Sequence, residues 1–543
     1  MTSTADAWDH VIVGAGSAGA VMAAHLAKDG HRVLLLEAGG DQPVPREATH
    51  PLADISRLIL NGYNWDYKAN LRGSKRLDNL LAAGQPRSLE ASAADDDRVT
   101  RALWSRFPYQ LGKVVGGGSA VNGAIALRGL PRDFQEWVAH GNPDWSWDDV
   151  VPFYRRSEND PDFPGALHGD DGPLPIRRPL REQLHELDAA FWDECSRQGL
   201  PDLPDLNAGQ ERGVGPVPSN ALDGERMDTG TTYLTPVRDL PNLELRTGTR
   251  VTRVLFEGNR AVGVELLEGE RPVTVRAGNV ILSAGAIGTP VILMRSGVAR
   301  AELLASLGVT PVVELPGVGE NLVDHPSVVI WSKPKSGVCK PGLPWRQVAS
   351  RMSSGFDEDV DIQVGLLNNV DSQTIPGFVD RLGWPMVVGI SVMLLRPESR
   401  GRVFLENADP RGRPVIELGL GTEDDDVSRL CHGVRKAWTI LRAPGLADRF
   451  EATQFWTDAM VANDKVLRSG VRNIMNPGWH ATGSARMGPA DDPMAVVDQD
   501  GRVHGTENLR IVDASVFPTI PSAPTNLTTI MLAEKIFHGT EQW

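Results

Sequence analysis

The chain has 543 residues, a formal net charge of −15, 41% hydrophobic residues and 23% charged residues. A chain of this length can bury several domain-sized cores, and this composition excludes an intrinsically disordered protein. The acidic balance also argues against a nucleic-acid partner, because phosphates require a basic surface.

The cysteines and the apolar segments indicate a compartment. Cys195, Cys339 and Cys431 are widely spaced and form no CxxC pair, which suits neither a disulfide framework nor a zinc site. No basic region precedes the first apolar run, and no apolar stretch reaches the roughly 18 residues that span a bilayer. We therefore expect a cytoplasmic protein with no membrane partner.

The first 37 residues read as a βαβ unit. An apolar run at 11–13 is followed by a glycine-rich turn, and then by a helix from about Ala18 to Asp29. Gly30 ends that helix where a left-handed residue is favoured. A second apolar run at 33–36 ends in Glu37. Continuous apolar strands joined by a helix predict a parallel sheet with both faces buried.

Two further apolar strands, at 280–282 and 509–512, have the same buried character and are expected to join this sheet. Residues 361–366, 387–395 and 402–405 instead predict a mainly antiparallel sheet, with a helix around 426–441. The fold class is therefore α/β (α+β overall), a Rossmann-like domain with a mixed or antiparallel-sheet domain. The predicted dinucleotide-binding domain comprises residues 1–158, 228–320 and 476–543, and the substrate-binding domain comprises residues 159–227 and 321–475.

A G-x-G-x-x-G motif, Gly14-Ala15-Gly16-Ser17-Ala18-Gly19, lies between the first strand and the helix. Gly14 makes the tight turn, Gly16 lets the backbone approach a pyrophosphate, and Gly19 allows close helix packing. Ser17 and Ala18 open the helix, whose N-terminal N–H groups attract phosphate. Glu37 suits ribose hydroxyls and repels a 2′-phosphate. The motif predicts a dinucleotide site and leaves NAD and FAD open; a glycine turn that only packs tightly is the alternative.

A second glycine run, Gly116-Gly117-Gly118-Ser119, also predicts close backbone approach to another group, such as a flat ring. Val114 and Val115 before it are apolar. These flanks favour a buried loop over a flexible surface loop.

The segment 112–135, with Asn122 and Gly123, resembles the first signature of the glucose–methanol–choline (GMC) oxidoreductases, which are FAD-dependent. Residues 285–298 resemble the second signature, although Ala299 replaces the glycine that usually follows it. Together with the first glycine motif and a C-terminal block, these matches occur in the family's order. The resemblance therefore spans the chain and implies the GMC fold with bound FAD.

The resemblance also implies how FAD is held. Some members attach FAD through a histidine at the position of Val121, and valine cannot form that bond, so the resemblance implies non-covalent FAD. The stretch from about Ser74 to Trp104 departs from the family, and a helix covering the flavin is one hypothesis for it. The implied cofactor contacts beyond the first motif and Glu37 are Trp65, Val115, Gly116, Ser119, Asn122, Gly123, Val251, Trp479, Asp513, Ala514, Asn526 and Leu527.

The C-terminal block carries the candidate catalytic pair. Alcohol oxidation needs a base for the hydroxyl proton, and histidine is suited to that task near neutral pH. It also needs a group that holds the hydroxyl oxygen, which an amide can do. The family pattern, a histidine before x-x-G and a later His or Asn, is matched by His480 and Asn526.

Several residues of this block have alternative readings. Asn526 could be the N-cap of a helix at 527–537, Asp513 could cap the turn after it, and Trp479 could be a pocket wall or core. His325 and His504 are expected to be structural. No metal site is predicted, and no serine-hydrolase elbow is present.

The resemblance implies an FAD-dependent alcohol oxidoreductase that acts on a small primary alcohol. The chain resembles members that oxidise furanic, benzylic or heteroaromatic alcohols with dioxygen as acceptor, which forms hydrogen peroxide. A choline- or alkanol-type dehydrogenase with another electron acceptor is the alternative, and a non-redox hydroxynitrile lyase is the alternative from another class. The oligomeric state is left open.

Overall fold

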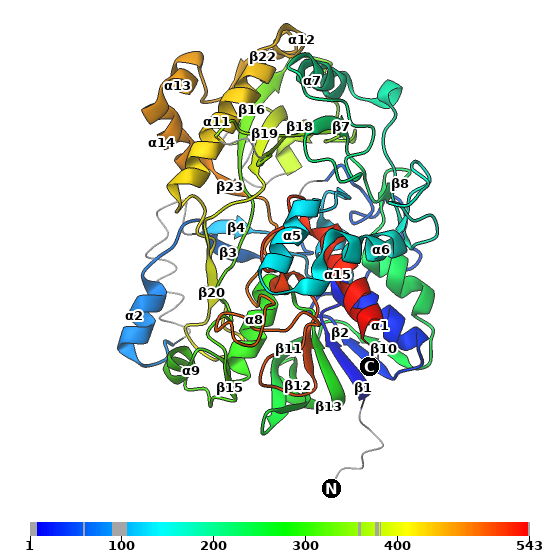
Figure 1. Ribbon diagram of the computed structural model, residues 1–543, viewed down its shortest axis with the longest axis vertical. Coiled ribbons are helices and arrows are strands. Elements are labelled where there is room, and N and C mark those ends of the chain that lie inside the picture. Colours follow the sequence, from blue (N-terminus) through cyan, green and yellow to red (C-terminus); the bar gives the residue numbers. More distant parts are fainter. Residues whose placement is uncertain are drawn as a thin grey trace.

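The computed structural model describes residues 8–57, 60–88, 106–356, 360–374, 380, 382–540 and 543. The hypothetical flavin-covering helix falls largely on residues 89–104, which lie outside the described residues. Before them, α2 (Arg76–Ala83) packs against α9 (Ala301–Leu307) at the lower left of Figure 1.

A seven-stranded sheet carries the predicted βαβ unit. Its parallel strands run in the order β10 (Leu243–Arg246), β2 (Val33–Leu36), β1 (Trp8–Val13), β13 (Arg271–Leu282) and β24 (Leu509–Ile511). The prediction that four distant apolar runs share one parallel sheet is confirmed. The first half of β13 pairs antiparallel with β12 (Arg260–Glu268), which pairs with β11 (Arg250–Glu257).

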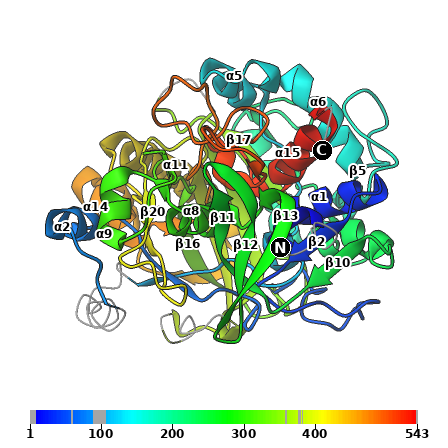
Figure 2. The ribbon, with the colours of Figure 1, turned by 90° about the horizontal axis from the view of Figure 1, so that it is seen from below.

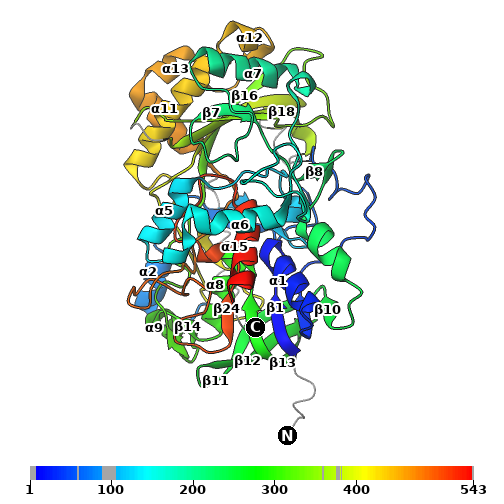
Figure 3. The same ribbon diagram turned by 45° about the vertical axis from the view of Figure 1, so that its right-hand side comes forward.

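Helices cover both sides of this sheet. α1 (Ser17–Lys28) contacts α15 (Thr525–Gly539), which contacts α6 (Trp147–Ser157), and the three lie together in Figure 3. α8 (Gly285–Arg295) packs on β11, and Figure 2 shows β13 between α8 and α1. Gly30 follows α1 with a φ of 91°, as its predicted position at the helix end requires.

An antiparallel sheet lies in the upper part of Figure 1. Its order is β22 (Phe450–Thr453), β16 (Pro326–Pro334), β19 (Met386–Leu394), β18 (Ile362–Asp371), β17 (Val348–Met352) and β7 (Gly213–Pro216), with β23 (Asn476–Pro477) beside β16. α11 (Asp424–Leu441) packs on β19 and β18, and α7 (Glu186–Arg197) packs on β17 and β18. The antiparallel strands expected at 361–366 and 387–395, and the helix around 426–441, are confirmed.

The strand expected at 402–405 belongs to a different sheet, so that part of the prediction is wrong. β20 (Arg402–Phe404) pairs with β21 (Val415–Glu417), and β21 pairs with β3 (Tyr67–Asn70), which pairs with β4 (Phe107–Tyr109). An apolar strand pattern shows that a strand forms, but its partner is chosen by tertiary packing. Because this sheet joins segments from both predicted domains, the domain boundaries stay a prediction.

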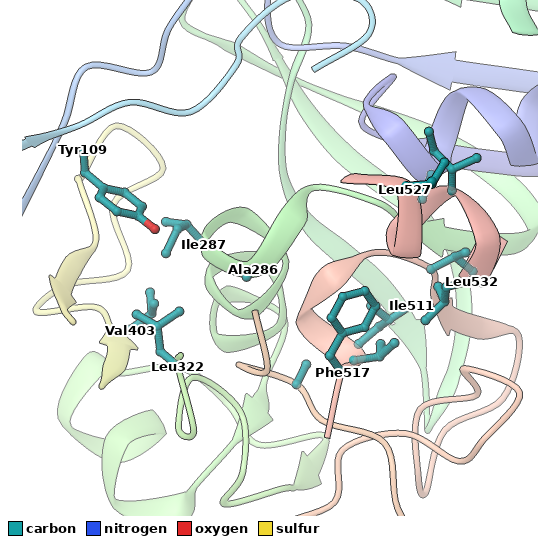
Figure 4. Close-up of a cluster of buried hydrophobic side chains, with 14 of the residues drawn as sticks. Tyr109, Ala286, Ile287, Leu322, Val403, Ile511, Phe517, Leu527 and Leu532 are labelled. Atoms are coloured by element: carbon teal, nitrogen blue, oxygen red, sulfur yellow. The ribbon is translucent and has the colours of Figure 1, made fainter. Parts of the chain in front are cut away.

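Buried side chains fix the elements that approach the centre of the molecule. Figure 4 shows Ile287 of α8 beside Tyr109, and Phe517 and Ile511 close to Leu532 of α15.

None of the helices among the described residues is long and apolar enough to cross a membrane. In the described part of the chain, the other α-helices and strands are α4 (Gly118–Val121), α5 (Pro131–Ala139), α12 (Pro444–Ala447), α13 (Asp458–Ala462), α14 (Asp464–Ile474), β5 (Glu158–Asn159), β6 (Leu174–Pro175), β8 (Ala221–Leu222), β9 (Glu225–Arg226), β14 (Val298–Ala299) and β15 (Val313–Glu314).

Candidate active site

A cavity of about 1520 Å³ lies between the two large sheets. Val13, Leu36 and Ser283, at the carboxyl ends of parallel strands, line one side of it, and Val329 and Met393 of the antiparallel sheet line the other. Ligands of doubly wound folds bind outside the carboxyl ends of the strands. This cavity is also larger than the roughly 300–1,000 Å³ of an ordinary small-molecule site, so it has room for a dinucleotide and a small substrate.

The first glycine motif forms one wall of the cavity. A Cβ on Gly14, whose φ is 102°, would lie 2.4 Å from the carbonyl oxygen of Ser283, and a Cβ on Gly19 would lie 1.9 Å from that of Gly14. These two glycines therefore allow close packing. Gly16 differs, because its Cβ would meet no protein atom nearer than 3.8 Å and the residue lines the cavity. The wall is open at the position where a pyrophosphate would approach.

The second glycine run packs directly on the first, so the expected buried loop is confirmed. The N–H of Gly116 donates to the carbonyl of Ala15 at 2.8 Å. A Cβ on Gly117 would lie 2.6 Å from the Cα of Gly16. Ser119 Oγ donates to the carbonyl of Gly116 at 2.6 Å. Of the residues expected to contact the cofactor, Asn122 and Gly123 line the cavity, whereas Gly19, Val115, Gly116, Ser119 and Leu527 lie behind its wall.

Glu37 lies at the end of β2 with its carboxylate buried. Its oxygens accept hydrogen bonds from the N–H of Ala15 at 3.0 Å and from the N–H of Gly39 at 2.7 Å. Burial raises the pKa of Glu37 to about 7 despite these bonds. The residue lines the cavity, as do Trp65 and Val251. This side of the cavity therefore has the acid and the flat ring expected around an adenosine.

The residues that line the cavity are compatible with bound FAD. The open wall at Gly16 and the uncapped, acid-free start of α1 suit a pyrophosphate. Val121 lines the cavity and has no group that could bond a flavin covalently. Asp513 caps the turn after β24, as one of its readings predicted, with its carboxylate accepting from Ser515 N–H at 2.8 Å. Ala514, next to it, lines the cavity.

His480 and His325 form a hydrogen-bonded pair. Their Nδ1 atoms are 2.9 Å apart, and His325 Nε2 lies 3.1 Å from the carbonyl oxygen of Leu395. A carbonyl only accepts, so we assign the His325 proton to Nε2, and its Nδ1 then accepts from His480 Nδ1–H. His480 Nε2 is thereby left with a free lone pair. His325, which is expected to be structural, therefore contacts the candidate base through its ring.

The surroundings of His480 favour its neutral form. Burial, followed by electrostatic interaction with His325 and with Arg346, lowers the pKa of His480 well below its usual 6.5. Burial also lowers the pKa of His325 to about 4. Both rings are therefore neutral at pH 7, as the tautomer assignment requires. A neutral imidazole that faces a cavity can accept a proton.

Asp324 holds the backbone that carries His480. Its Oδ1 accepts from the N–H of Gly478 at 3.1 Å and of His480 at 3.0 Å, and Tyr109 donates to Oδ2 at 2.5 Å. Between the two bonded residues, Trp479 has a φ of 60°, which is rare for a bulky side chain. Trp479 is 43% exposed and lines the cavity, so it is a wall and not core.

Asn526 faces the same cavity from the start of α15. The N-cap of that helix is Pro524 and no side chain caps it, so the N-cap reading of Asn526 is wrong. Asn526 lies inside the first turn, and its Oδ1 accepts from Ser17 Oγ at 2.7 Å. This bond orients the amide and leaves the Nδ2 donors for another partner. His504 Nε2 lies 3.1 Å from the carbonyl oxygen of Gly488, and the residue does not line the cavity.

Sequence reasoning missed the substrate side of the cavity. Along β16, Ser327, Val329 and Trp331 line the cavity, while Val328 and Ile330 between them are fully buried. The alternation of side chains between the two faces of the strand can be expected from the sequence, but it does not indicate which face contacts the ligand. Other side chains on this side of the cavity are Phe107, Trp345, Arg346, Leu367, Ser391, Met393, Gln454, Trp456, Asn473 and Asn476.

Comparisons with known proteins agree with this geometry. Sequence profiles described as GMC oxidoreductase match residues 8–327 and 397–533. The chain is 35% identical to a 5-(hydroxymethyl)furfural oxidase of Methylovorus sp. (strain MP688) over 561 residues, which cover 99% of this chain and 98% of the relative. It is 34% identical to an oxygen-dependent choline dehydrogenase of Vibrio vulnificus (strain YJ016), with 97% and 93% covered.

Among solved structures, a pyridoxine 4-oxidase from Mesorbium loti superposes with a TM-score of 0.83 at 27% identity, covering 98% of this chain and 100% of that one. The two matched segments contain all the strands of the parallel sheet, whereas β17, β18 and β19 of the antiparallel sheet lie between them. The chain therefore belongs to the GMC oxidoreductase family and is an FAD-dependent alcohol oxidoreductase.

Proposed function

We propose that this protein oxidises a small primary alcohol on an aryl, furanic or heteroaromatic ring to the aldehyde, and that dioxygen accepts the electrons and forms hydrogen peroxide. The observation that carries the proposal is the free Nε2 of His480, held by His325 in a cavity with aromatic walls. The chain is 35% identical to a relative named for 5-(hydroxymethyl)furfural, and it shares its fold with a structure named for pyridoxine, which supports this substrate class.

In the proposed mechanism, the substrate ring lies between the side chains of Trp331, Trp479 and Phe107. His480 Nε2 accepts the hydroxyl proton, and the amide of Asn526 donates to the hydroxyl oxygen and orients its carbon. Bound FAD supplies the acceptor for the hydride. The apolar walls exclude water from the proton transfer.

The residues proposed to hold non-covalent FAD are those of the two glycine loops and the strand ends. Gly14, Gly16, Ser17, Ala18, Glu37, Trp65, Asn122, Gly123, Val251, Trp479, Asp513, Ala514 and Asn526 line the cavity directly. Cys195, Cys339 and Cys431 are unpaired, which supports a reducing, cytoplasmic compartment.

The choline-type alternative has less support on the substrate side of the cavity. Among the described residues that line the cavity, the only acids are Glu37 and Asp513, both next to the parallel strands. Arg346 carries a positive charge on the opposite side. A quaternary ammonium group is stabilised by acids and open aromatic faces, and it is repelled by a guanidinium.

The test is the visible absorption of the anaerobic holoenzyme before and after addition of benzyl alcohol, 5-(hydroxymethyl)furfural, pyridoxine, choline or mandelonitrile. We expect a ring-bearing alcohol to bleach the flavin bands, and air to restore them rapidly. Bleaching by choline alone, or slow recovery in air, would favour the dehydrogenase. Cleavage of mandelonitrile with no bleaching by any alcohol would favour the lyase.

A further inference from the structure

Arg346 is an unneutralised cation in the cavity wall. It lies just before β17 and lines the same cavity as His480 and Asn526. Among the described residues no carboxylate lies within ion-pair distance of its guanidinium. A charge placed beside an apolar cavity without a counterion is costly unless a ligand supplies one.

The guanidinium is held by a neutral hydroxyl. Arg346 Nη2 donates to Ser391 Oγ at 2.7 Å, and Ser391 Oγ donates in turn to the carbonyl of Gly365 at 3.1 Å. Ser391 therefore orients the Arg346 side chain but does not neutralise it. The Nε atom is buried without a hydrogen-bond partner, and a guanidinium has five N–H donors in a planar fork.

Asp188 is the carboxyl group with the strongest electrostatic effect on Arg346, but it forms hydrogen bonds with other groups. Asp188 accepts from the N–H of Val348 at 3.2 Å and from the side chain of Asn368. Burial raises the pKa of Asp188 to about 7, so its negative charge is incomplete at neutral pH. Burial lowers the pKa of Arg346 only to about 10, so the guanidinium stays charged.

The guanidinium also acts on the candidate base. The charge of Arg346 is one of the causes that lower the pKa of His480, so the two groups belong to one electrostatic site. The cavity that both groups line also has apolar and aromatic side chains in its wall, including Val329, Trp331 and Met393. Such a site suits a ring with a hydroxymethyl group near His480 and an anion near Arg346.

We propose that the preferred substrate is a carboxylate-bearing aromatic alcohol, whose carboxylate accepts a forked pair of hydrogen bonds from Arg346. This inference rests on the proposed function, because it places the hydroxymethyl group of that substrate at His480. Planar two-point recognition of a carboxylate is the task to which arginine is best suited.

The test compares 4-(hydroxymethyl)benzoate and 3-(hydroxymethyl)benzoate with the corresponding methyl esters, in the wild type, Arg346→Met and Arg346→Lys. The measured quantity is the efficiency of anaerobic bleaching by the acid divided by that of its methyl ester. This ratio is used because loss of the Arg346 charge also changes the pKa of His480, which affects both substrates equally. We expect Arg346→Met to lower this ratio about 30-fold or more, the scale for a lost buried charge pair. Arg346→Lys should retain part of it, and Ser391→Ala should reduce it less than Arg346→Met.

A dead-end ligand separates this inference from the proposed function. Calorimetric titration of the oxidised holoenzyme with 4-methylbenzoate and 4-methylbenzamide needs no alcohol oxidation. The inference is supported if the wild type binds 4-methylbenzoate more tightly than 4-methylbenzamide and Arg346→Met does not. This result would stand even if no alcohol bleached the flavin, an outcome that would refute only the proposed function. Equal binding of the two ligands, or an acid-to-ester ratio unchanged in a folded, flavin-loaded Arg346→Met, overturns the inference.

Discussion

At the scale of single residues, the protonation state of His480 decides whether a proton can leave the alcohol. Burial, then His325 and Arg346, lowers the pKa of His480 well below 6.5. A base with a lowered pKa is already neutral at pH 7 and loses its competence only when the pH falls through that lowered pKa. We therefore expect anaerobic bleaching rates that are flat from pH 8 to pH 6.5. A limb with a midpoint at or above 6.5 would contradict the assignment.

The role of His480 itself is tested by His480→Ala. Positioned bases contribute about 10²- to 10⁴-fold to proton transfer, so we expect the anaerobic bleaching rate to fall on that scale. FAD content and melting temperature serve as controls, since the ring faces the cavity and not the core. An unchanged bleaching rate would show that another group accepts the proton.

His325 sets which nitrogen of His480 carries the proton, by accepting from its Nδ1. His325→Phe removes the acceptor, and we expect about a tenfold or greater loss of bleaching rate, because the useful tautomer is no longer favoured. His325→Gln is the matched variant, since an amide oxygen can accept the same bond. If the glutamine variant is no better than the phenylalanine variant, His325 acts by packing and not by hydrogen bonding.

At the scale of elements, the glycines of the first loop have separable tasks. A Cβ on Gly16 meets no protein atom within 3.8 Å, whereas a Cβ on Gly19 would lie 1.9 Å from the backbone oxygen of Gly14. The first substitution should therefore affect the ligand, and the second should affect the fold.

The expected results for the two alanine variants are opposite. Gly16→Ala should lower the stability of the apoprotein by less than about 1 kcal/mol and weaken FAD binding about tenfold or more, about 1.4 kcal/mol. Gly19→Ala should cost about 3 kcal/mol of folding free energy. Thermal unfolding of the apoproteins and titration with FAD measure both. Equal losses of FAD affinity in two equally stable variants would contradict this division.

At the scale of the whole molecule, a buried ion network ties distant loops together. His168 lies 3.0 Å from Glu158, 3.1 Å from Asp160 and 2.9 Å from Asp205, and Arg178 pairs with both aspartates. Burial by itself lowers the pKa of His168, but its hydrogen bonds to Asp160, Asp205 and Glu158 outweigh burial and raise the pKa to about 10. The folded state therefore retains a proton that the unfolded chain releases near pH 6.5.

This proton makes stability depend on alkaline pH. The contribution of His168 is complete below pH 6.5 and is lost as the pH rises towards 10, by at most about 1.4 kcal/mol per pH unit. Melting temperatures between pH 6.5 and 10 measure the decline. His168→Gln should be less stable at pH 7 and should decline less steeply. Parallel declines in the two proteins would assign the pH dependence to other groups.

Local spacing in the sequence was enough to predict the dinucleotide site and the parallel sheet. Gly14, Gly16, Gly19 and Glu37 lie within one βαβ unit, where a few residues of strand, turn and helix dictate the geometry. The family resemblance extended this prediction to FAD and to the pair His480 and Asn526. Strand partners such as that of β20 escaped prediction, because pairing depends on packing across the chain.

The environment of the candidate catalytic groups depends on contacts between residues far apart in the sequence. Ser17 and Asn526 are hydrogen-bonded although 509 residues separate them in the sequence. His325 and His480 are hydrogen-bonded across a separation of 155 residues. Arg346 carried no sequence signal, because an arginine before a strand reads as solvent-exposed until packing places it in the cavity. Motif spacing reports short-range backbone geometry, whereas tautomers, lowered pKa values and substrate charge follow from burial and neighbours, which exist only after the chain has folded.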